Sequence, residues 1–402
     1  ADAPATLRNL RITDSTDVVL HDLILGFERT PDAGAPNDIC ARVEEGLSFG
    51  ACTAGQLGVE ASQSTVSLAA VAIDCVGFGN ESGGTAILGQ TNSSLTITDT
   101  TIQEVGSFGI RVNDTSLTVN DVSILSVNRD PSAQDFESNG SAVYVESSQE
   151  EVLLNGLTAN NGVFVAAWVE SARLTVANSS FSNFNYGVYM PGDAASASGR
   201  RLTVTDSEFL DLRQEAILAV ASSEIVGNRF AMENLIPHTQ GGTFNSGVRL
   251  LGGGSSHVVS NNTFDNLGVR ALAAAGSAAD GNIGEFLAEG NTITNIYGGR
   301  GIDLVQVDTA TLNGNVIDGI DHAYNDDPTD PGSISSGFGI DAFLVDDLTM
   351  SGNAVTGAEF GNYVIVNASF RSTDDLAGEG MGRGFHIESS QGSFTNPTIL
   401  DQ

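Results

Sequence analysis

Two aspartates are spaced so that they could act together on a carbohydrate. Asp303 and Asp341 each stand third in a Gly-Ile-Asp stretch. If these stretches form neighbouring strands in register, the residues lie about 5 Å apart, where two carboxylates repel and one takes up a proton. With Arg300 and His386 in similar stretches, the pair suits glycoside hydrolysis or uronate elimination, one group acting as acid and another as base. A solvent-exposed row of aspartates neutralised by arginines is the alternative.

A second acidic group lies between residues 318 and 330. Carboxylate and carbonyl oxygens at this density suit a hard cation such as Ca²⁺, the one cofactor that the sequence indicates. The spacing lacks the ordered ligands and the glycine of an EF-hand loop. A solvated acidic loop in an acidic protein is therefore the alternative. The aspartates are Asp318, Asp321, Asp326, Asp327 and Asp330.

These residues belong to a chain that repeats one short motif. At Leu348–Val355 the motif reads LTMSGNAV, and close copies occur at Leu174–Phe181 and Leu202–Phe209. Two apolar residues two apart describe a short strand, the next residue but one turns the chain at positive φ, and another apolar residue begins the next strand. The predicted turn residues are Asp22, Ala70, Asp99, Asp121, Gly156, Asn178, Asp206, Gly227, Asn261, Gly290, Gly314, Gly352 and Asn396.

Five successive copies place asparagine directly after the turn residue. If the copies stack, the side-chain amides bond to one another and to turn backbone, which predicts an asparagine ladder. A simple preference of turns for asparagine explains the same pattern. The five residues are Asn228, Asn262, Asn291, Asn315 and Asn353.

A second recurring strand, opened by glycine, lies between the motif copies. Gly247–Leu250, Gly301–Leu304 and Gly384–Ile387 are examples with a period of two, whereas helical periodicity is nearly absent. Strands that pair only with the same strand of the next repeat form parallel sheets without crossover helices. We therefore predict an all-β fold: a right-handed, single-stranded parallel β-helix of about 13 coils, with residues 1–402 as one domain.

On the motif and asparagine positions, the chain resembles the right-handed parallel β-helix (pectate-lyase-like) superfamily of extracellular repeat proteins over nearly all its length. The resemblance implies an architecture rather than an activity, because this fold hosts lyases, hydrolases, tailspikes, adhesins and surface filaments. The set of polygalacturonase-like motifs is missing, and the chain has no lysine. Both absences count against an enzyme of that type.

Irregular stretches interrupt the repeats. Residues 28–57 contain Cys40 and Cys52, which we expect to close a disulfide in a loop or small cap, with Cys75 left as a buried thiol. Long loops on a rigid solenoid are the usual place for binding. Further loop insertions are predicted at residues 128–140, 192–200, 233–246 and 317–337.

The charge balance excludes several classes of partner. Fifty acidic residues against 16 basic ones give a formal net charge of −34, which is unsuited to non-specific nucleic-acid binding or to anionic lipid. No apolar run is long enough to span a membrane. The first residues, ADAPAT, resemble a mature start after removal of a signal peptide, so we expect a secreted or cell-surface protein.

The two ends of a β-helix leave a coil of unpaired backbone and apolar core. Because no convincing cap is found at either end of the sequence, we expect copies to stack head to tail into an extracellular filament or surface layer. This predicts a structural or adhesive role rather than an enzyme. The alternatives are a polysaccharide lyase or glycoside hydrolase, and an adhesin that binds extracellular polysaccharide through Tyr144, Tyr189 and the long loops.

Overall fold

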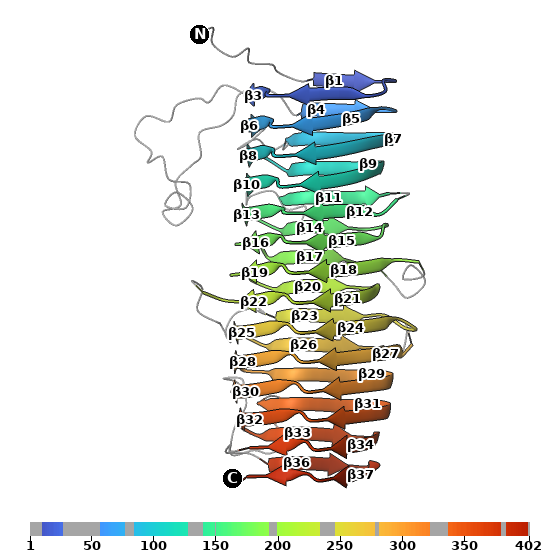
Figure 1. Cartoon of the computed structure of the whole chain (residues 1–402), viewed down its shortest axis with the longest axis vertical. Coiled ribbons are helices and arrows are strands. Elements are labelled where there is room, and N and C mark those ends of the chain that lie inside the picture. The colour runs from blue at the N-terminus through green and yellow to red at the C-terminus, as the bar shows by residue number, and fades with distance from the viewer. Residues whose placement is uncertain are drawn as a thin grey trace. The chain divides into compact units, whose positions relative to one another are not determined.

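In the part of the chain that the structure describes, the regular elements are β-strands arranged in parallel ladders (Figure 1). The chain divides into two compact units, Ala1–Ala172 and Arg173–Gln402, and each is described by itself. None of the described stretches contains a helix suited to crossing a membrane. The computed structural model describes residues 10–26, 57–76, 84–127, 140–148, 150–192, 199–233, 246–277, 281–321, 337–378 and 383–400.

One coil consists of three strands, which we call the opening, middle and closing strands. Each pairs in parallel with the equivalent strand of the next coil, which is the arrangement of a parallel β-helix. Two successive coils of the second unit are β20 (Glu215–Ala219), β21 (Ser222–Val226) and β22 (Arg229–Ala231), paired with β23 (Ser246–Leu251), β24 (Ser256–Ser260) and β25 (Thr263–Leu267).

The first unit is built from such coils. Its opening strands are β1 (Leu10–Thr13), β4 (Leu57–Ser62), β11 (Ser141–Ser147) and β14 (Val165–Val169), and its middle strands are β2 (Val18–His21), β5 (Thr65–Ala69) and β12 (Val152–Asn155). The long strands β7 (Thr85–Thr98) and β9 (Phe108–Asn120) serve as opening and middle strand together. The closing strands are β3 (Ile24–Gly26), β6 (Ala72–Val76), β8 (Thr101–Val105), β10 (Ser123–Val127) and β13 (Thr158–Gly162).

The second unit continues the same plan within itself. Besides β20 and β23, its opening strands are β17 (Tyr186–Met190), β26 (Arg270–Ala275), β33 (Gly361–Val366) and β36 (Arg383–Glu388). Besides β21 and β24, its middle strands are β15 (Leu174–Ala177), β18 (Arg201–Thr205), β27 (Ile283–Glu289), β34 (Ser369–Thr373) and β37 (Gln391–Thr395). β29 (Arg300–Asn313) and β31 (Phe338–Ser351) serve as both. Besides β22 and β25, the closing strands are β16 (Ser180–Ser182), β19 (Glu208–Leu210), β28 (Thr292–Tyr297), β30 (Val316–Asp321), β32 (Ala354–Ala358), β35 (Leu376–Ala377) and β38 (Thr398–Ile399).

The predicted turn positions all adopt a left-handed backbone. Each has a positive φ, including Ala70 at 51°. A further copy of the motif turns at Asp374 with φ 54°, and the sequence pattern misses it because Ser372 replaces the central apolar residue. At Gly352 the φ is 63° and an added Cβ would have no atom within 4 Å, so glycine is needed there for its backbone alone.

The interior is stacked as regularly as the backbone. Phenylalanines of successive closing strands pack ring on ring, with centroids 5.2, 4.9 and 4.7 Å apart. The glycine that opens β23 makes room for this stack, because a Cβ on Gly247 would lie 2.6 Å from Cδ1 of Phe264 and would also collide with the Ala271 carbonyl. The stacked residues are Phe181, Phe209, Phe230 and Phe264.

The asparagines that follow the turn residues are buried and hydrogen-bonded from coil to coil. Oδ1 of Asn291 accepts from the backbone N–H and the Nδ2 of Asn262, at 3.0 and 3.1 Å. Its own Nδ2 donates to Oδ1 of Asn315 and to the Val259 carbonyl, both at 2.9 Å. Every polar atom of this side chain is thus paired inside the core, as a buried amide requires.

This row ends on a carboxylate. One oxygen of Asp375, Oδ1, accepts from the backbone N–H and the Nδ2 of Asn353, at 2.8 and 2.9 Å, and Ser372 donates to its Oδ2 at 2.6 Å. Each bond between neighbouring side chains of the row runs from an Nδ2 to the side-chain oxygen of the later coil. Because an ionised carboxylate only accepts, Asp375 closes the row without leaving a donor unpaired.

Cys75 differs from the sequence prediction. It is buried and disulfide-bonded, so the expectation of a free thiol is wrong. Cys40 and Cys52 lie outside the described residues. Three cysteines form at most one disulfide within a chain, so the bond at Cys75 competes with the pairing predicted for the other two.

The predicted insertions lie mostly outside the described residues. One boundary is corrected, because residues 317–321 belong to strand β30 rather than to the insertion predicted at 317–337. Ile317 and Ile320 of this strand are fully buried, so the core rather than the acidic neighbours decides their conformation. The single domain predicted for residues 1–402 stays a prediction.

Candidate functional site

Asp303 and Asp341 occupy directly paired positions of β29 and β31. Parallel neighbouring strands lie about 4.8 Å apart, so the two carboxyl groups share one site. Both are buried, with 3% of Asp303 and 9% of Asp341 exposed, although they stand on the side of the strand that faces away from the core. Burial of two adjacent carboxylates requires compensating positive charge.

Two arginines supply that charge. Nη1 of Arg270, on β26, lies 3.0 Å from Oδ2 of Asp303, and Nη1 of Arg300 lies 3.0 Å from its Oδ1. Nε of Arg300 is also 2.9 Å from Oδ2 of Asp341, so this one guanidinium joins both carboxylates. Arg270 and Arg300 are themselves paired across β26 and β29. The result is a compact network with alternating charge.

Asp341 is the chemically perturbed member of the network. Burial raises its pKa to about 6; the Arg300 guanidinium opposes this rise and Asp303 adds to it. Burial also perturbs Arg270, because it disfavours the charged guanidinium and so lowers the pKa of this residue. Asp341 can therefore hold a proton at mildly acidic pH, next to a carboxylate that is paired with two arginines. That is the combination from which a proton donor is made.

His386 does not join these residues. Val364 of β33 pairs with Asp341 on one side and with His386 on the other, so a whole strand separates the imidazole from the aspartates. Instead, Arg383 Nη1 lies 2.7 Å from His386 Nδ1, and Glu388 lies 3.6 Å from its Nε2. Three of the four predicted residues, Asp303, Asp341 and Arg300, lie together. The fourth charged residue of the network is Arg270 rather than His386.

The earlier coils extend the network along the same face of the opening strands. Arg249 of β23 lies 3.4 Å from Glu215 of β20, and burial raises the pKa of Glu215. On β17, the rings of Tyr186 and Tyr189 are 5.0 Å apart. We call the six charged residues the arginine strip; they are Glu215, Arg249, Arg270, Arg300, Asp303 and Asp341.

Sequence reasoning missed Arg270 and Glu215 for one reason. The recurring strand is recognised by its glycine, and at these coils alanine stands there instead, as Ala271 after Arg270 and Ala216 after Glu215. Both alanines are buried at the same register as Gly247. Allowing any small residue at the opening position would have found them.

The acidic stretch from 318 is only partly described. Asp318 and Asp321 lie on β30, where Oδ1 of Asp318 accepts from the Thr356 hydroxyl at 2.6 Å. Asp326, Asp327 and Asp330 lie outside the described residues. Among the residues that the structure does place, no three His, Cys, Asp or Glu side chains are grouped to hold a metal ion.

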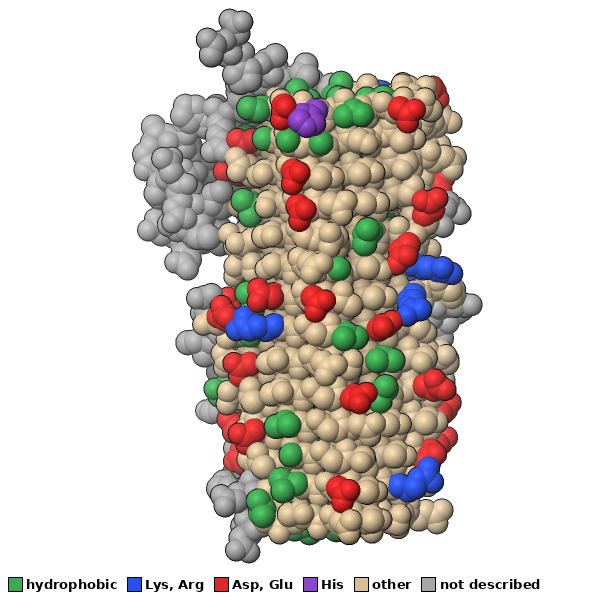
Figure 2. Space-filling model, in the orientation of Figure 1, with side chains coloured by type: hydrophobic (Ala, Val, Ile, Leu, Met, Phe, Trp, Pro, Cys, Tyr) green, Lys and Arg blue, Asp and Glu red, His purple; other side chains and the backbone are tan. Residues whose placement is uncertain are grey.

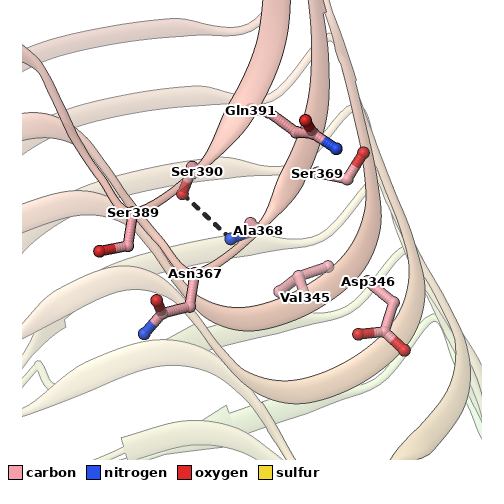
Figure 3. A pocket seen from close by; sticks show the side chains of 8 residues that line it. All are labelled: Val345, Asp346, Asn367, Ala368, Ser369, Ser389, Ser390 and Gln391. Atoms are coloured by element: carbon pink, nitrogen blue, oxygen red, sulfur yellow. Dashed lines mark hydrogen bonds between the residues drawn. The ribbon is translucent and has the colours of Figure 1, made fainter.

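A shallow polar hollow of about 530 Å³ lies at the corner between opening and middle strands of the last coils (Figure 3). Its lining carries hydroxyl and amide groups, and within it the Ser390 hydroxyl accepts the Ala368 N–H at 3.0 Å. Asp346 is its one lining carboxylate. A single carboxylate without a histidine or a second acid does not form an acid–base pair.

The tyrosines expected to bind glycans are less available than predicted. Tyr144 is 6% exposed, packs its ring against Phe108 and Trp168, and donates its hydroxyl to Glu170 at 2.8 Å. Tyr189 is only half-buried. Tyr144 is therefore a packing residue of the first unit, and an adhesive role for it is not supported.

Residues 83–264 match the family model of the right handed beta helix region. The fold is a right-handed parallel β-helix. Among solved structures, this β-helix is similar to the periplasmic alginate epimerase AlgG, with 11% identity, a TM-score of 0.41, and 95% of this chain and 85% of that chain covered. It is also similar to the tailspike protein of E. coli bacteriophage HK620 in complex with a pentasaccharide, with 12% identity, a TM-score of 0.41, and coverage of 97% and 71%.

These similarities are too low to transfer a substrate or an activity to this β-helix. Among curated proteins, no sequence matches it.

Proposed function

We propose that the protein is an extracellular β-helix that binds an anionic polysaccharide along the arginine strip. The observation that carries this proposal is the distribution of charge. In a chain with a formal net charge of −34, Arg249, Arg270 and Arg300 gather on one face beside two carboxyl groups of raised pKa, those of Glu215 and Asp341. When these two groups are protonated, the strip carries more positive than negative charge.

The layering of the strip favours binding over cleavage. The arginines are the outer layer, with 41% of the Arg249 side chain, 31% of Arg270 and 25% of Arg300 exposed, whereas 4% of the Asp303 side chain is exposed. Asp303 therefore holds two guanidinium groups in fixed positions from below. The exposed N–H groups of Arg249 and Arg270 can donate to carboxylate or sulfate groups along a glycan.

Binding to a panel of uronate and sulfated polysaccharides, measured by calorimetry at about pH 5 and about pH 7.5, tests this proposal. We expect tighter binding at the lower pH, because Asp341, whose pKa is about 6, then loses its negative charge. Arg249→Gln and Arg270→Gln should each weaken binding roughly tenfold, as expected for the loss of a charged hydrogen bond. Arg371→Gln, which removes an exposed ion pair with Asp347 outside the strip, is the matched control. Equal binding by all three variants would contradict the proposal.

An acid–base reaction at the same carboxyl groups is the finer version of this proposal. Its test is the appearance of new reducing ends or of unsaturated ends in the polysaccharides that bind. If cleavage occurs, Asp341→Asn should abolish it while binding persists, because the variant keeps the arginines and loses the proton. Cleavage that survives in this variant would place the chemistry elsewhere.

End-to-end assembly is the second candidate, and it rests on the coil formed by β36, β37 and β38. Core positions that are fully buried in the preceding coil are open here: Ile399 is 60% exposed where its partner Ala377 is buried, and Phe394 is 37% exposed opposite the buried Ser372. An apolar sheet edge of this kind pairs readily with another coil. We propose that a second copy supplies that coil, which would give a filament or surface layer.

Sedimentation and negative-stain microscopy of the double variant Phe394→Asp, Ile399→Asp test the assembly. We expect wild-type protein to form elongated particles that grow with concentration and the variant to remain monomeric. Phe343→Asp is the control, since Phe343 is similarly exposed but lies outside the last coil. Monomeric wild-type protein at high concentration would end this candidate. Repeating the series with calcium and with EDTA tests whether assembly depends on calcium, the ion that residues 318–330 are expected to bind.

A location outside the cell is part of both candidates. The disulfide at Cys75 supports it, because disulfides persist in oxidising compartments.

A further inference from the structure

A histidine lies inside the apolar core of the second unit. His257 of β24 is 1% exposed, and its neighbours in register are Ser223 on β21 and Phe286 on β27, both also buried. Its Nε2 lies 2.7 Å from Oγ of Ser255, which is 4% exposed. A polar ring in this position must satisfy its two nitrogens within the core.

The hydrogen bonds fix the tautomer of the ring. Ser255 Oγ is also 2.8 Å from the carbonyl oxygen of Gly252, which can only accept, so the hydroxyl hydrogen points to Gly252. Ser255 then accepts from His257, and the hydrogen of the neutral ring is on Nε2. Nδ1 is a bare acceptor, buried and without a hydrogen-bond partner.

A proton on Nδ1 finds no acceptor and no compensating charge. The three acidic residues on the paired strands stand on the opposite side of the sheet: Glu224 pairs with Val258, Glu285 with Ser256 and Glu289 with Ser260. Burial alone lowers the pKa of His257 to about 4. Since the ordinary pKa is 6.5, the folded corner favours the neutral ring, and protonation of the ring favours an opened corner.

We propose that Ser255 and His257 form an acid-sensitive lock on the corner of residues 252–255, which joins β23 to β24. With the ring neutral, two hydrogen bonds in series close the corner: Nε2–H donates to the Ser255 hydroxyl, and that hydroxyl donates to the Gly252 carbonyl. When His257 takes up a proton, the charged ring leaves the core or admits water, and the Ser255–Gly252 bond is lost with it. The corner is a weak point because Gly252 and Gly254, with φ of 109° and 68°, add no side-chain packing to hold it.

Hydrogen exchange of the peptide spanning residues 250–260, corrected for intrinsic rates, tests the lock at about pH 7.5 and about pH 4.5. With a folded pKa of about 4 and an open-state value of 6.5, the ratio of open to closed corner should rise about 70-fold in the wild type. His257→Leu should remove this rise, and leucine fits because Leu202 and Leu348 occupy equivalent positions. His386→Gln, at a site away from the core, should keep it. An equal rise in His257→Leu would overturn the proposal.

A second measurement needs only the wild-type protein. Nitrogen-15 spectra of labelled histidine should show one ring as the neutral Nε2–H tautomer at about pH 7, with a titration midpoint below about pH 5. That resonance should be absent from the spectrum of His257→Leu. If all five histidines titrate near their ordinary pKa, or if the buried ring carries its hydrogen on Nδ1, the lock does not exist.

Discussion

Burial, more than the neighbouring aspartate, gives Asp341 its unusual chemistry. The sequence predicts a raised pKa from repulsion between paired carboxylates. In the structure, desolvation is the largest cause, the Arg300 guanidinium partly reverses it, and Asp303 contributes least. The arginine between the two carboxylates accounts for the order, because it neutralises much of the repulsion that two bare charges would feel.

The raised pKa of Asp341 predicts a specific pH dependence of stability. Its folded value is about 6 against an ordinary 3.8, so the folded state holds the proton more tightly than the unfolded state does. The free energy of unfolding contributed by this group is then highest below about pH 4 and falls as pH rises through 6. Relative to Asp341→Asn, the wild type should lose up to about 3 kcal/mol between those limits.

Urea denaturation of both proteins across this pH range measures the difference. His257 titrates in the same range with the opposite sign, but it is present in both proteins and cancels from the comparison. Asp347→Asn, on the same strand but exposed and paired with Arg371, should follow the wild-type curve. A difference between wild type and Asp341→Asn that does not change with pH would show that Asp341 is not perturbed.

At the scale of the element, the buried asparagine row should be costly to interrupt. Asn291→Ala leaves the backbone N–H and the Nδ2 of Asn262 without their acceptor. It also removes the amide that donates to Oδ1 of Asn315 and to the Val259 carbonyl. We expect the free energy of unfolding to fall by about 2–4 kcal/mol, because buried polar groups lose their partners. Thermal or urea unfolding gives the value. Asn313→Ala, in the following coil and facing outward, should change stability by no more than about 0.5 kcal/mol.

Two glycines should respond differently to alanine, since they are required for different reasons. Gly247→Ala places a methyl group against Phe264 and the Ala271 carbonyl, and we expect a loss of about 3 kcal/mol from overpacking. Gly352→Ala meets no atom within 4 Å and costs only the left-handed conformation, about 1–2 kcal/mol. Gly352→Asn should recover much of that loss, because asparagine tolerates this backbone. The reverse order in unfolding experiments would show that the phenylalanine stack can yield.

The elements also show where the sequence pattern fails. β33 reads GNYVIV, so its glycine is followed by Asn362 and Tyr363, and it does not match the glycine-opened strands. Missing this strand brought His386 one coil too close to Asp341. The parallel pairing of β33 with β31 and β36 restores the true spacing, because strand order is fixed by stacking and not by similarity of sequence.

At the scale of the molecule, charge is the dominant fact. The formal net charge is −34, and on the face in view acidic side chains are scattered over the surface, with a few close together near its edges (Figure 2). Spreading the charges limits each local repulsion, but the sum still destabilises the compact state.

Salt should therefore stabilise the protein. Raising sodium chloride from about 0.05 M to about 1 M shortens the Debye length from above 10 Å to about 3 Å and screens this repulsion. We expect the melting temperature to rise by roughly 5 °C in scanning calorimetry. Potassium chloride should act equally, since screening does not distinguish the two cations. An unchanged melting temperature would mean that repulsion among the distributed charges does not affect the stability of the fold.

The sequence by itself determined the coil of this protein, because a turn at positive φ and inward apolar residues are local requirements that each repeat must meet alone. The predicted turn positions and the pairing of Asp303 with Asp341 follow from that regularity. Only the tertiary structure decided that Asp341 is buried, that Arg270 holds Asp303, and that one ring nitrogen of His257 has no hydrogen-bond partner. These facts depend on what covers a residue from other coils, and no repeat contains that information.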